Sequence, residues 1–316
     1  MDGLWSPELD STILSDVSVV EQAIEAWGPD ELVVVVGPTA SGKTELAAGL
    51  CEKVGGEVVS ADSIQVYREF DKGSGKPTAE QLSRAPHHLV GTRDPLEPLD
   101  ASGWADLATQ AIADVRARGR VPIVCGGTFL WIKALIFGLS GAPSGNAELR
   151  ARYELIARTE GRAALHERLR AVDPASAERL HPNDVTRVSR ALEVYELTSK
   201  PMSAWQKEHG FATVRHCARL VGLECTPECM EERIRARASQ WLATGWIEEV
   251  QALLARGYGS ARAMQSVGYA EVRAMLDGQL ARDDLETAIV RATRVFARKQ
   301  RTWLKHANVH WIRSEG

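Results

Sequence analysis

The chain has 316 residues, of which 44% are hydrophobic and 25% are charged, with a formal net charge of −4 at pH 7. This composition is typical of a globular protein, and the length suffices for one large core with an insertion or for two domains. No apolar run approaches the ~20 residues that a membrane helix needs, and the weakly acidic charge does not by itself indicate a nucleic-acid partner.

Residues 1–30 are interpreted as an acidic N-terminal extension, with a short helix expected over 17–27. Eight Asp or Glu residues precede the first basic residue, Lys43, whereas targeting signals begin with basic residues, so we expect a cytoplasmic protein. The five cysteines, an odd number, fit reduced thiols in that compartment. A zinc site built from His216 and three of these cysteines would lack a matching second pair of ligands.

The first strong structural signal lies between Leu32 and Lys53. Leu32–Val36 is a continuous apolar run that predicts a buried strand, and Glu45–Lys53 predicts a helix. The segment between them has the G-x-x-x-x-G-K-T spacing of a phosphate-binding P-loop. Its glycines let backbone N–H groups converge on an anion, and the start of the helix adds a positive end. The predicted phosphate-binding residues are Gly37, Pro38, Thr39, Ala40, Ser41, Gly42, Lys43 and Thr44.

Two side chains of this loop have distinct expected roles. Lys43 would place a positive charge on phosphate oxygens. The Thr44 hydroxyl would be a ligand to a bound Mg²⁺, which we expect as the cofactor.

Two further predicted strands bring polar residues to the edge where the P-loop lies. Gly56–Ser60 predicts a strand that ends close to Asp62, and Arg120–Cys125 predicts one that runs into Gly126-Gly-Thr128. Strand, helix and strand in this order indicate a parallel sheet, whose ligands bind at the carboxyl ends of the strands. We therefore expect Asp62 and Thr128 beside the P-loop. The second of these strands lacks the terminal Asp that a Walker-type motor uses for Mg²⁺ and water, which counts against ATP hydrolysis.

A composition change divides the chain. Small and helix-breaking residues gather at Gly138–Gly145, and the following residues to about 210 show helical patterns without a strand pattern. We therefore predict an α/β fold, a P-loop NTPase-like parallel sheet flanked by helices, formed by 31–140 and 211–316. Residues 141–210 would be an all-helical insertion.

The last third of the chain carries two basic features. After a strand at Arg215–Glu224, expected to close the sheet, helix Pro227–Thr244 has Arg237 at the margin of its apolar face, where it would either reach the solvent or bind an anion. In the helix Thr287–Lys305 there are six basic residues and no acidic one. Five of them, spaced by three and four, form a basic stripe: Arg291, Arg294, Arg298, Arg301 and Lys305. The opposite side would carry Ile289, Ala292, Phe296 and Trp303. An unmixed stripe favours a polyanionic partner.

Taken together, these segments resemble the tRNA dimethylallyltransferase (isopentenyltransferase) family. The resemblance rests on the P-loop and, in order, on Ser60-Ala-Asp-Ser-Ile-Gln-Val-Tyr67, Gly73-Ser-Gly-Lys-Pro77, Pro86-His-His-Leu89, Gly126-Gly-Thr128, His181-Pro-Asn-Asp-Val-Thr-Arg-Val-Ser-Arg-Ala-Leu-Glu193, Val267-Gly-Tyr269 and Arg298-Lys-Gln-Arg-Thr-Trp303. A P-loop alone is common, whereas this ordered set, which spans residues 32 to 312, is specific.

The resemblance implies an unusual use of the P-loop. It would hold the diphosphate of dimethylallyl diphosphate and hydrolyse no nucleotide. The acceptor would be N6 of the adenosine 3′-adjacent to the anticodon of a tRNA, and the products would be N6-(dimethylallyl)adenosine and diphosphate. The base would be flipped out of its stack to reach the site. The protein is expected to act as a monomer.

Four residues would carry the chemistry. An exocyclic amine is a poor nucleophile, so a carboxylate must take its proton, and Asp62 is the candidate. Thr128 would donate a hydrogen bond to the departing bridging oxygen. Lys43 and Arg237, with Mg²⁺ at Thr44, would stabilise the charge of the leaving group.

The correspondence also implies which residues contact the tRNA. They are Asp62, Ser63, Ile64, Gln65, Thr128, Arg150, Thr186, Arg187, Val188, Ser189, Arg190, Gln265, Ser266, Val267, Gly268, Tyr269, Ala270, Arg298, Lys299, Gln300, Arg301, Thr302, Trp303, Leu304 and Lys305. Four positions depart from the family pattern without removing a group assigned to chemistry: Glu69, Gly75, Trp131 and Ala270.

Three other functions compete with this interpretation. An adenylate dimethylallyltransferase would prenylate free AMP, but it would need neither the helical insertion nor the basic last helix. A P-loop small-molecule kinase would use Asp62 to activate a hydroxyl, but it would carry an Arg-rich lid over ATP, for which the sequence gives no clear signal. A non-catalytic RNA-binding protein would not need the whole set of predicted catalytic residues.

Overall fold

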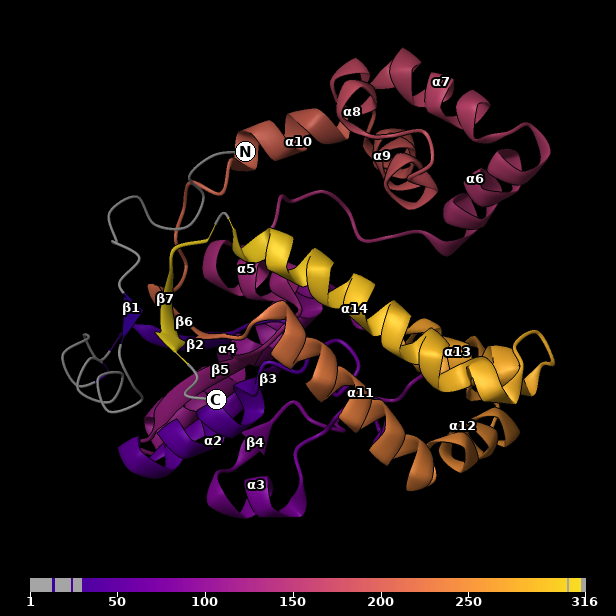
Figure 1. The fold of residues 1–316 in the computed structure, drawn as a ribbon. Helices are drawn as coiled ribbons and strands as arrows, with labels where there is room; N and C mark the ends of the chain where they lie inside the picture. The colour runs from indigo at the N-terminus through magenta and orange to yellow at the C-terminus, as the bar shows by residue number, and fades with distance from the viewer. Residues whose placement is uncertain (1–12, 15–23, 25–29, 306, 314–316) are drawn as a thin grey trace. The chain divides into compact units, whose positions relative to one another are not determined.

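The computed structural model describes residues 13–14, 24, 30–305 and 307–313 (Figure 1). The chain forms two compact units. The first consists of Met1–Ile136 and Arg215–Gly316, and the second of Phe137–Val214. The second unit covers the predicted insertion, residues 141–210, with a few more residues at either end. The expected helix over 17–27 lies outside the described residues, apart from Ile24.

The first unit is built on a parallel sheet, which confirms the predicted α/β class. Its seven described strands lie in the order β1-β7-β6-β2-β5-β3-β4, and every pair among them is parallel. The strands are β1 (Ile13–Leu14), β2 (Leu32–Val36), β3 (Gly56–Ala61), β4 (His87–His88), β5 (Val121–Gly126), β6 (Ala218–Glu224) and β7 (Val309–Arg313).

The expectation that the strand at Arg215–Glu224 closes the sheet is wrong. β6 pairs with β7 on the side away from β2, so that Leu220 is opposite Val309, and β7 pairs in turn with β1. The missed strand is only five residues long and mixes His and Arg with the buried Val309 and Ile312. Such a short segment shows no clear alternation by which a strand could be predicted.

The first unit also contains helices from both ends of the sequence. They are α2 (Lys43–Val54), α3 (Ala79–Arg84), α4 (Ala101–Ala117), α5 (Phe129–Phe137), α11 (Pro227–Ala243), α12 (Trp246–Ala255), α13 (Tyr269–Leu276) and α14 (Leu285–Leu304). The central strand β2 is buried along its whole length, and Val33 and Val35 pack on Leu46 and Leu50 of α2. Each such buried aliphatic side chain contributes roughly 1.5–3 kcal/mol. α11 packs on α14, the long yellow helix of Figure 1.

The second unit is helical throughout its described elements. These are α6 (Ala147–Thr159), α7 (Arg162–Val172), α8 (Pro174–Arg179), α9 (Val185–Thr198) and α10 (Met202–His209). Polar side chains begin three of them: Asn146, Asp173 and Asp184 each accept a backbone N–H three residues later. Such caps satisfy otherwise unpaired donors at a helix start. A small apolar core with Leu165 and Leu169 holds the helices together.

The register of the central strands positions the site. Gly126, the last residue of β5, is opposite both Val36 of β2 and Ala61 of β3. A Cβ at Gly126 would come within 2.2 Å of the Ala61 carbonyl oxygen, so only glycine fits there. The residues that follow β2, β3 and β5 therefore leave the sheet together at one edge. Within the described residues, no helix is both long and apolar enough to cross a membrane.

Candidate active site

The loop between β2 and α2 has the conformation of an anion cradle. Gly42 precedes α2 at φ +95° and supplies no side-chain cap, so the first N–H groups of the helix remain open to a ligand. Gly37 approaches the Ser41 side chain so closely that a Cβ would lie 2.7 Å from its Oγ. Ala40 adopts φ +65°, a strained conformation for a residue other than glycine. The loop predicted from the sequence motif thus has a conformation that could hold a phosphate.

Lys43 lies inside this cradle. Its ammonium donates to the Pro38 carbonyl oxygen at 2.7 Å, which holds it at the loop. Burial lowers the pKa of Lys43 to about 8, Asp62 opposes this decrease, and the nearby Arg237 adds to it. A bound polyanion would replace the lost hydration and stabilise the charged form.

Two arginines of α11 reach the same loop. Arg237 donates to Thr39 Oγ1 at 2.6 Å, and its guanidinium lies 4.7 Å from the centre of the Trp241 ring. Burial lowers the pKa of Arg237 to about 10, and Asp62 opposes this shift. The sequence left open whether Arg237 would face the solvent, and the structure places it at the P-loop.

Arg233 is the second of these arginines, and the sequence analysis did not select it. Its guanidinium lies 3.4 Å from the Ser41 carbonyl oxygen and lines the P-loop cavity. Arg233 precedes Arg237 by four residues, so both lie on one face of α11. That spacing was the signal by which it could have been found.

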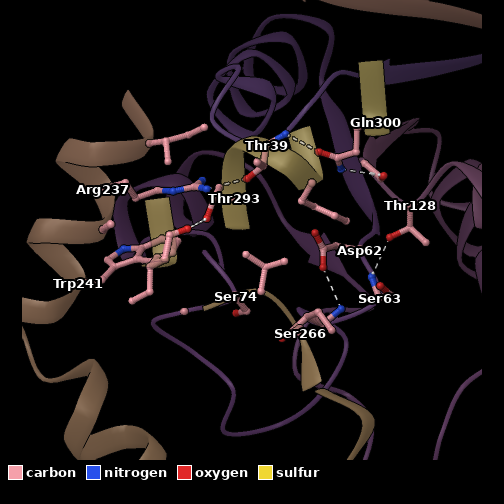
Figure 2. A pocket seen from close by; sticks show the side chains of 18 of the residues that line it. Thr39, Asp62, Ser63, Ser74, Thr128, Arg237, Trp241, Ser266, Thr293 and Gln300 are labelled. Atoms are coloured by element: carbon pink, nitrogen blue, oxygen red, sulfur yellow. Dashed lines mark hydrogen bonds between the residues drawn. The ribbon is translucent and has the colours of Figure 1, made fainter. Parts of the chain in front are cut away.

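Asp62 and Thr128 meet beside the loop, as the topology predicted. The N–H groups of Ile64 and Gln65 donate to Asp62 Oδ1 at 2.9 and 3.1 Å, which orients the carboxylate and leaves Oδ2 without a hydrogen bond from the described residues. Figure 2 shows Asp62 beside Ser63 and Thr128. Thr128 Oγ1 accepts the N–H of Ser63 at 3.1 Å, so its own hydroxyl hydrogen can be donated elsewhere.

Two adjoining cavities of about 320 and 310 Å³ share this carboxylate. The second follows the P-loop and is lined by Lys43, Thr44, Arg233 and Arg237. The first, the apolar cavity, combines apolar side chains such as Trp241 and Trp246 with polar ones such as Asp62 and Thr128. The residues that line both are Thr39, Asp62, Ser74, Gly127, Arg237, Phe296 and Gln300.

Trp246 is the packing centre of the apolar cavity. Its ring stands perpendicular to those of Trp241, at 5.4 Å, and Tyr269, at 5.7 Å. Gly73 and Gly268 approach it so closely that a Cβ at either would lie 2.2 Å from a ring atom. The aromatic cluster therefore fixes two loops that border the cavity.

The expected tRNA-contacting residues of the first unit fall into three groups. Asp62, Ser63, Ile64, Thr128, Gln265, Ser266 and Val267 line the apolar cavity, and Gln65 lines the P-loop cavity. Gly268 and Tyr269 are buried in the Trp246 cluster, and Ala270 is half-buried. On α14 and just after it, Arg298, Lys299, Arg301, Thr302, Trp303 and Lys305 are exposed, whereas Gln300 and Leu304 are buried.

The predicted apolar side of the last helix needs correction. Ile289 is buried, but Phe296 and Trp303 are 42% and 41% exposed. The described buried face consists of Leu285, Ile289, Val290, Thr293, Ala297, Gln300 and Leu304. Trp303 instead stacks on Phe129 at a ring distance of 6.4 Å, at the border of the buried face. The basic stripe is exposed, and one member, Arg294, pairs with Glu231 of α11 at 3.2 Å.

The remaining expected tRNA contacts belong to the second unit. There Glu193, fully buried, accepts from Arg190 at 2.8 Å and lies 3.7 Å from Arg150. Arg187 pairs with Asp184 at 3.0 Å and is exposed. Thr186 is exposed, and Val188 and Ser189 are buried within the unit.

The P-loop cavity contains oxygen donors that suit Mg²⁺. The Thr44 hydroxyl lies there, and Mg²⁺ is typically bound by one or two protein oxygens together with substrate phosphates and water. Within the described part of the chain, no group of three or more His, Cys, Asp or Glu residues could hold a metal ion.

Comparison with known proteins gives one consistent result. The family model described as IPP transferase matches residues 65–307, and that described as isopentenyl transferase matches residues 30–97. A tRNA dimethylallyltransferase of Sorangium cellulosum is 61% identical over 92% of this chain and 93% of its own length. A tRNA dimethylallyltransferase 1 of Citrifermentans bemidjiense is 44% identical over 90% of this chain and 93% of its own.

Solved structures agree with the sequence comparisons. A full-length tRNA isopentenylpyrophosphate transferase of Bacillus halodurans has 35% identity and a TM-score of 0.66, with 90% of each chain covered. A eukaryotic dimethylallyltransferase described as acting on tRNA has 26% identity and a TM-score of 0.75 over 90% of this chain and 74% of its own. The chain therefore belongs to the IPP transferase family, the family of the tRNA dimethylallyltransferases, and is a prenyltransferase.

Proposed function

We propose that this protein transfers a dimethylallyl group from dimethylallyl diphosphate to N6 of the adenosine 3′-adjacent to the anticodon of a tRNA. The observation that carries the proposal is the position of Asp62, which lines both the cationic P-loop cavity and the apolar cavity. A base at this boundary can take a proton from an amine while a leaving group departs into the P-loop.

The donor would occupy both cavities. Its diphosphate fits the open N–H groups at the start of α2, where Lys43 and Arg237 supply positive charge and Arg233 adds a third cation. Its dimethylallyl group fits the apolar wall formed by Trp241 and Trp246. Mg²⁺ held through Thr44 would neutralise charge on the diphosphate oxygens.

The acceptor amine would approach from the Asp62 side. The adenosine N6 attacks the allylic carbon, a C–N bond forms, the C–O bond to the diphosphate breaks, and the N6 proton passes to Asp62. The lone pair of an exocyclic amine is delocalised into the ring, so removing this proton as the bond forms makes the attack feasible. The Thr128 hydroxyl, which can still donate, would stabilise the departing bridging oxygen.

The RNA would be held mainly by charge. The exposed basic side chains of α14 face the solvent in one stripe and suit the phosphates of an anticodon stem-loop. The expected contacts in the second unit, Arg150 and Thr186 to Arg190, would add further interactions with the RNA. We further propose that the protein acts as a monomer in the cytoplasm, where it would meet its tRNA substrates.

Three acceptors distinguish this function from its competitors. The protein is incubated with Mg²⁺ and labelled dimethylallyl diphosphate together with an anticodon stem-loop that carries adenosine at the target position, with the same stem-loop carrying guanosine there, or with AMP. We expect label only in the first RNA. Label in AMP alone would favour an adenylate dimethylallyltransferase. In a separate incubation with ATP, phosphorylation of a small molecule by a protein that transfers no prenyl group would favour a kinase.

A further inference from the structure

Gln300 is a buried amide on the basic helix α14. Only 6% of its surface is exposed, although its neighbours Lys299 and Arg301 face the solvent. Its Oε1 accepts the backbone N–H of Thr39 at 2.8 Å, and its Nε2 donates to the Gly127 carbonyl oxygen at 3.0 Å. Figure 2 shows Gln300 beside Thr39, on the side opposite Arg237.

These two bonds require an amide. One partner is a donor and the other an acceptor, which also fixes the orientation of the side chain. A carboxylate in place of this amide would have no hydrogen for Gly127, and a methionine of similar length would leave both backbone groups unpaired. Gly127 makes room for the contact, since a Cβ there would lie 2.4 Å from Gln300 Nε2.

The segments that Gln300 joins carry the two halves of the reaction. Thr39 is the tip of the P-loop, and its hydroxyl is held from the other side by Arg237 at 2.6 Å. Gly127 precedes Thr128, whose backbone N–H donates to the Ala61 carbonyl oxygen at 3.2 Å and whose Oγ1 accepts from Ser63 at 3.1 Å. Both of those partners are the chain neighbours of Asp62.

We propose that Gln300 is a positioning residue that sets the distance between the diphosphate cradle and the turn carrying Asp62 and Thr128. In-line transfer needs the leaving group and the attacking amine on opposite sides of one carbon, and a displacement of about 1 Å can cost about a hundredfold in rate. Gln300 is thus distinguished from its exposed neighbours on α14, which would contact phosphates. This inference rests on the proposed prenyl transfer.

Steady-state and binding measurements on full-length variants test it. Gln300→Met and Gln300→Glu should lower kcat by about ten- to a hundredfold. The Kd for the stem-loop should change by less than about twofold, which is the size of effect that a typical surface substitution has. Gln251→Glu, the same change at an exposed position of α12, is the matched control and should retain full kcat. Thermal melting of each variant shows whether the fold is intact at the assay temperature.

A double-mutant cycle separates positioning from general damage. Gly127→Ala should displace the Gln300 amide and reproduce its kcat loss. In the Gln300→Ala background the added methyl group meets no amide, so Gly127→Ala should have little further effect. Strong non-additivity of this kind reports a direct coupling between the two residues.

Each outcome decides between roles. A normal kcat in a Gln300→Met variant that remains folded, or additive losses in the cycle, would overturn the inference. A raised stem-loop Kd with unchanged kcat would make Gln300 an RNA contact instead. If the unsubstituted protein transfers no prenyl group, the proposed function itself fails, and that result is seen before any variant is compared.

Discussion

At the scale of single residues, the candidate site contains ionisable groups whose orientations and pKa values depend on neighbouring residues. The Asp62 carboxylate is oriented by two backbone N–H groups on one oxygen, and Lys43 is held against the P-loop by Pro38. Asp62 opposes the decrease in the pKa values of both Lys43 and Arg237. The Asp62 carboxylate and the cations Lys43 and Arg237 are therefore electrostatically linked.

Changing Asp62 to Asn should isolate its role as a base. Asn keeps an oxygen that can accept from Ile64 and Gln65, so the turn should remain intact, but it cannot take the N6 proton. We expect the single-turnover rate to fall by about 10²–10⁴-fold, with little change in the Kd for dimethylallyl diphosphate. Asp62→Ala should lose as much rate and also stability. An Asn variant as fast as the original protein would remove Asp62 from this role.

The lowered pKa of Lys43 predicts a pH-dependent affinity for the donor. Below its pKa of about 8, the Lys43 side chain is charged. Above this pKa, Lys43 of the donor-free protein is a neutral amine, and it must take up a proton before an ammonium group can bind the diphosphate. The Kd should therefore rise by up to about tenfold per pH unit above this pKa. Lys43→Arg remains charged over this range. Because both proteins meet the same ligand, the ratio of their Kd values should change with pH; a constant ratio would contradict the prediction.

At the scale of elements, loops are fixed by packing against single rigid side chains. Trp246, at the start of α12, contacts Gly73 in one loop and Gly268 at the start of α13. Glu249, also on α12, accepts two hydrogen bonds: one from the backbone N–H of Lys72 at 2.8 Å and one from the Tyr269 hydroxyl at 2.7 Å. The wall of the apolar cavity is thus one connected structure.

Gly73→Ala should disturb this wall. The added methyl group would overlap the buried Trp246 ring, and such overpacking costs about 1–3 kcal/mol in the free energy of unfolding. Gly49→Ala in α2 is the control in the same unit, because its Cβ would meet only the end of the flexible Arg84 side chain, at 3.4 Å. Urea unfolding followed by tryptophan fluorescence measures both. Equal stability of the two variants would show that the loop yields without cost.

The basic stripe predicts a graded response to charge removal. Arg298 is exposed and, among the described residues, lies in no ion pair, whereas Arg294 already pairs with Glu231. Arg298→Gln should weaken stem-loop binding and reduce the slope of log K against log salt by about one. Arg294→Gln should change both less. Filter binding over a range of salt concentrations decides, and identical slopes for the two variants would argue against phosphate contact at Arg298.

At the scale of the whole molecule, the sequence predicted the features that a local motif or the order of parallel strands determines. The P-loop motif specified its own conformation, and the parallel strand order brought Asp62 and Thr128 to the same edge. The strand β7 was missed because five mixed residues show no clear period. Arg233 was missed although its spacing from Arg237 was visible.

The buried face of α14 was predicted only in part, for a physical reason. The expected apolar side included Phe296 and Trp303, which are partly exposed, whereas the polar Gln300 is buried. A side chain buried for its hydrogen bonds cannot be recognised by an apolar pattern, because its partners, Thr39 and Gly127, lie far away in sequence. Such contacts require the tertiary structure.

The most direct test of the account follows bond formation and bond cleavage in one experiment. The protein is mixed in a single turnover with dimethylallyl diphosphate and the adenosine-containing stem-loop, and both products are quantified over time. We predict that N6-(dimethylallyl)adenosine and diphosphate appear at the same rate and in equal amounts, without ATP. Diphosphate release without prenylated RNA, or prenyl attached to an atom other than N6 of the target adenosine, would contradict the account.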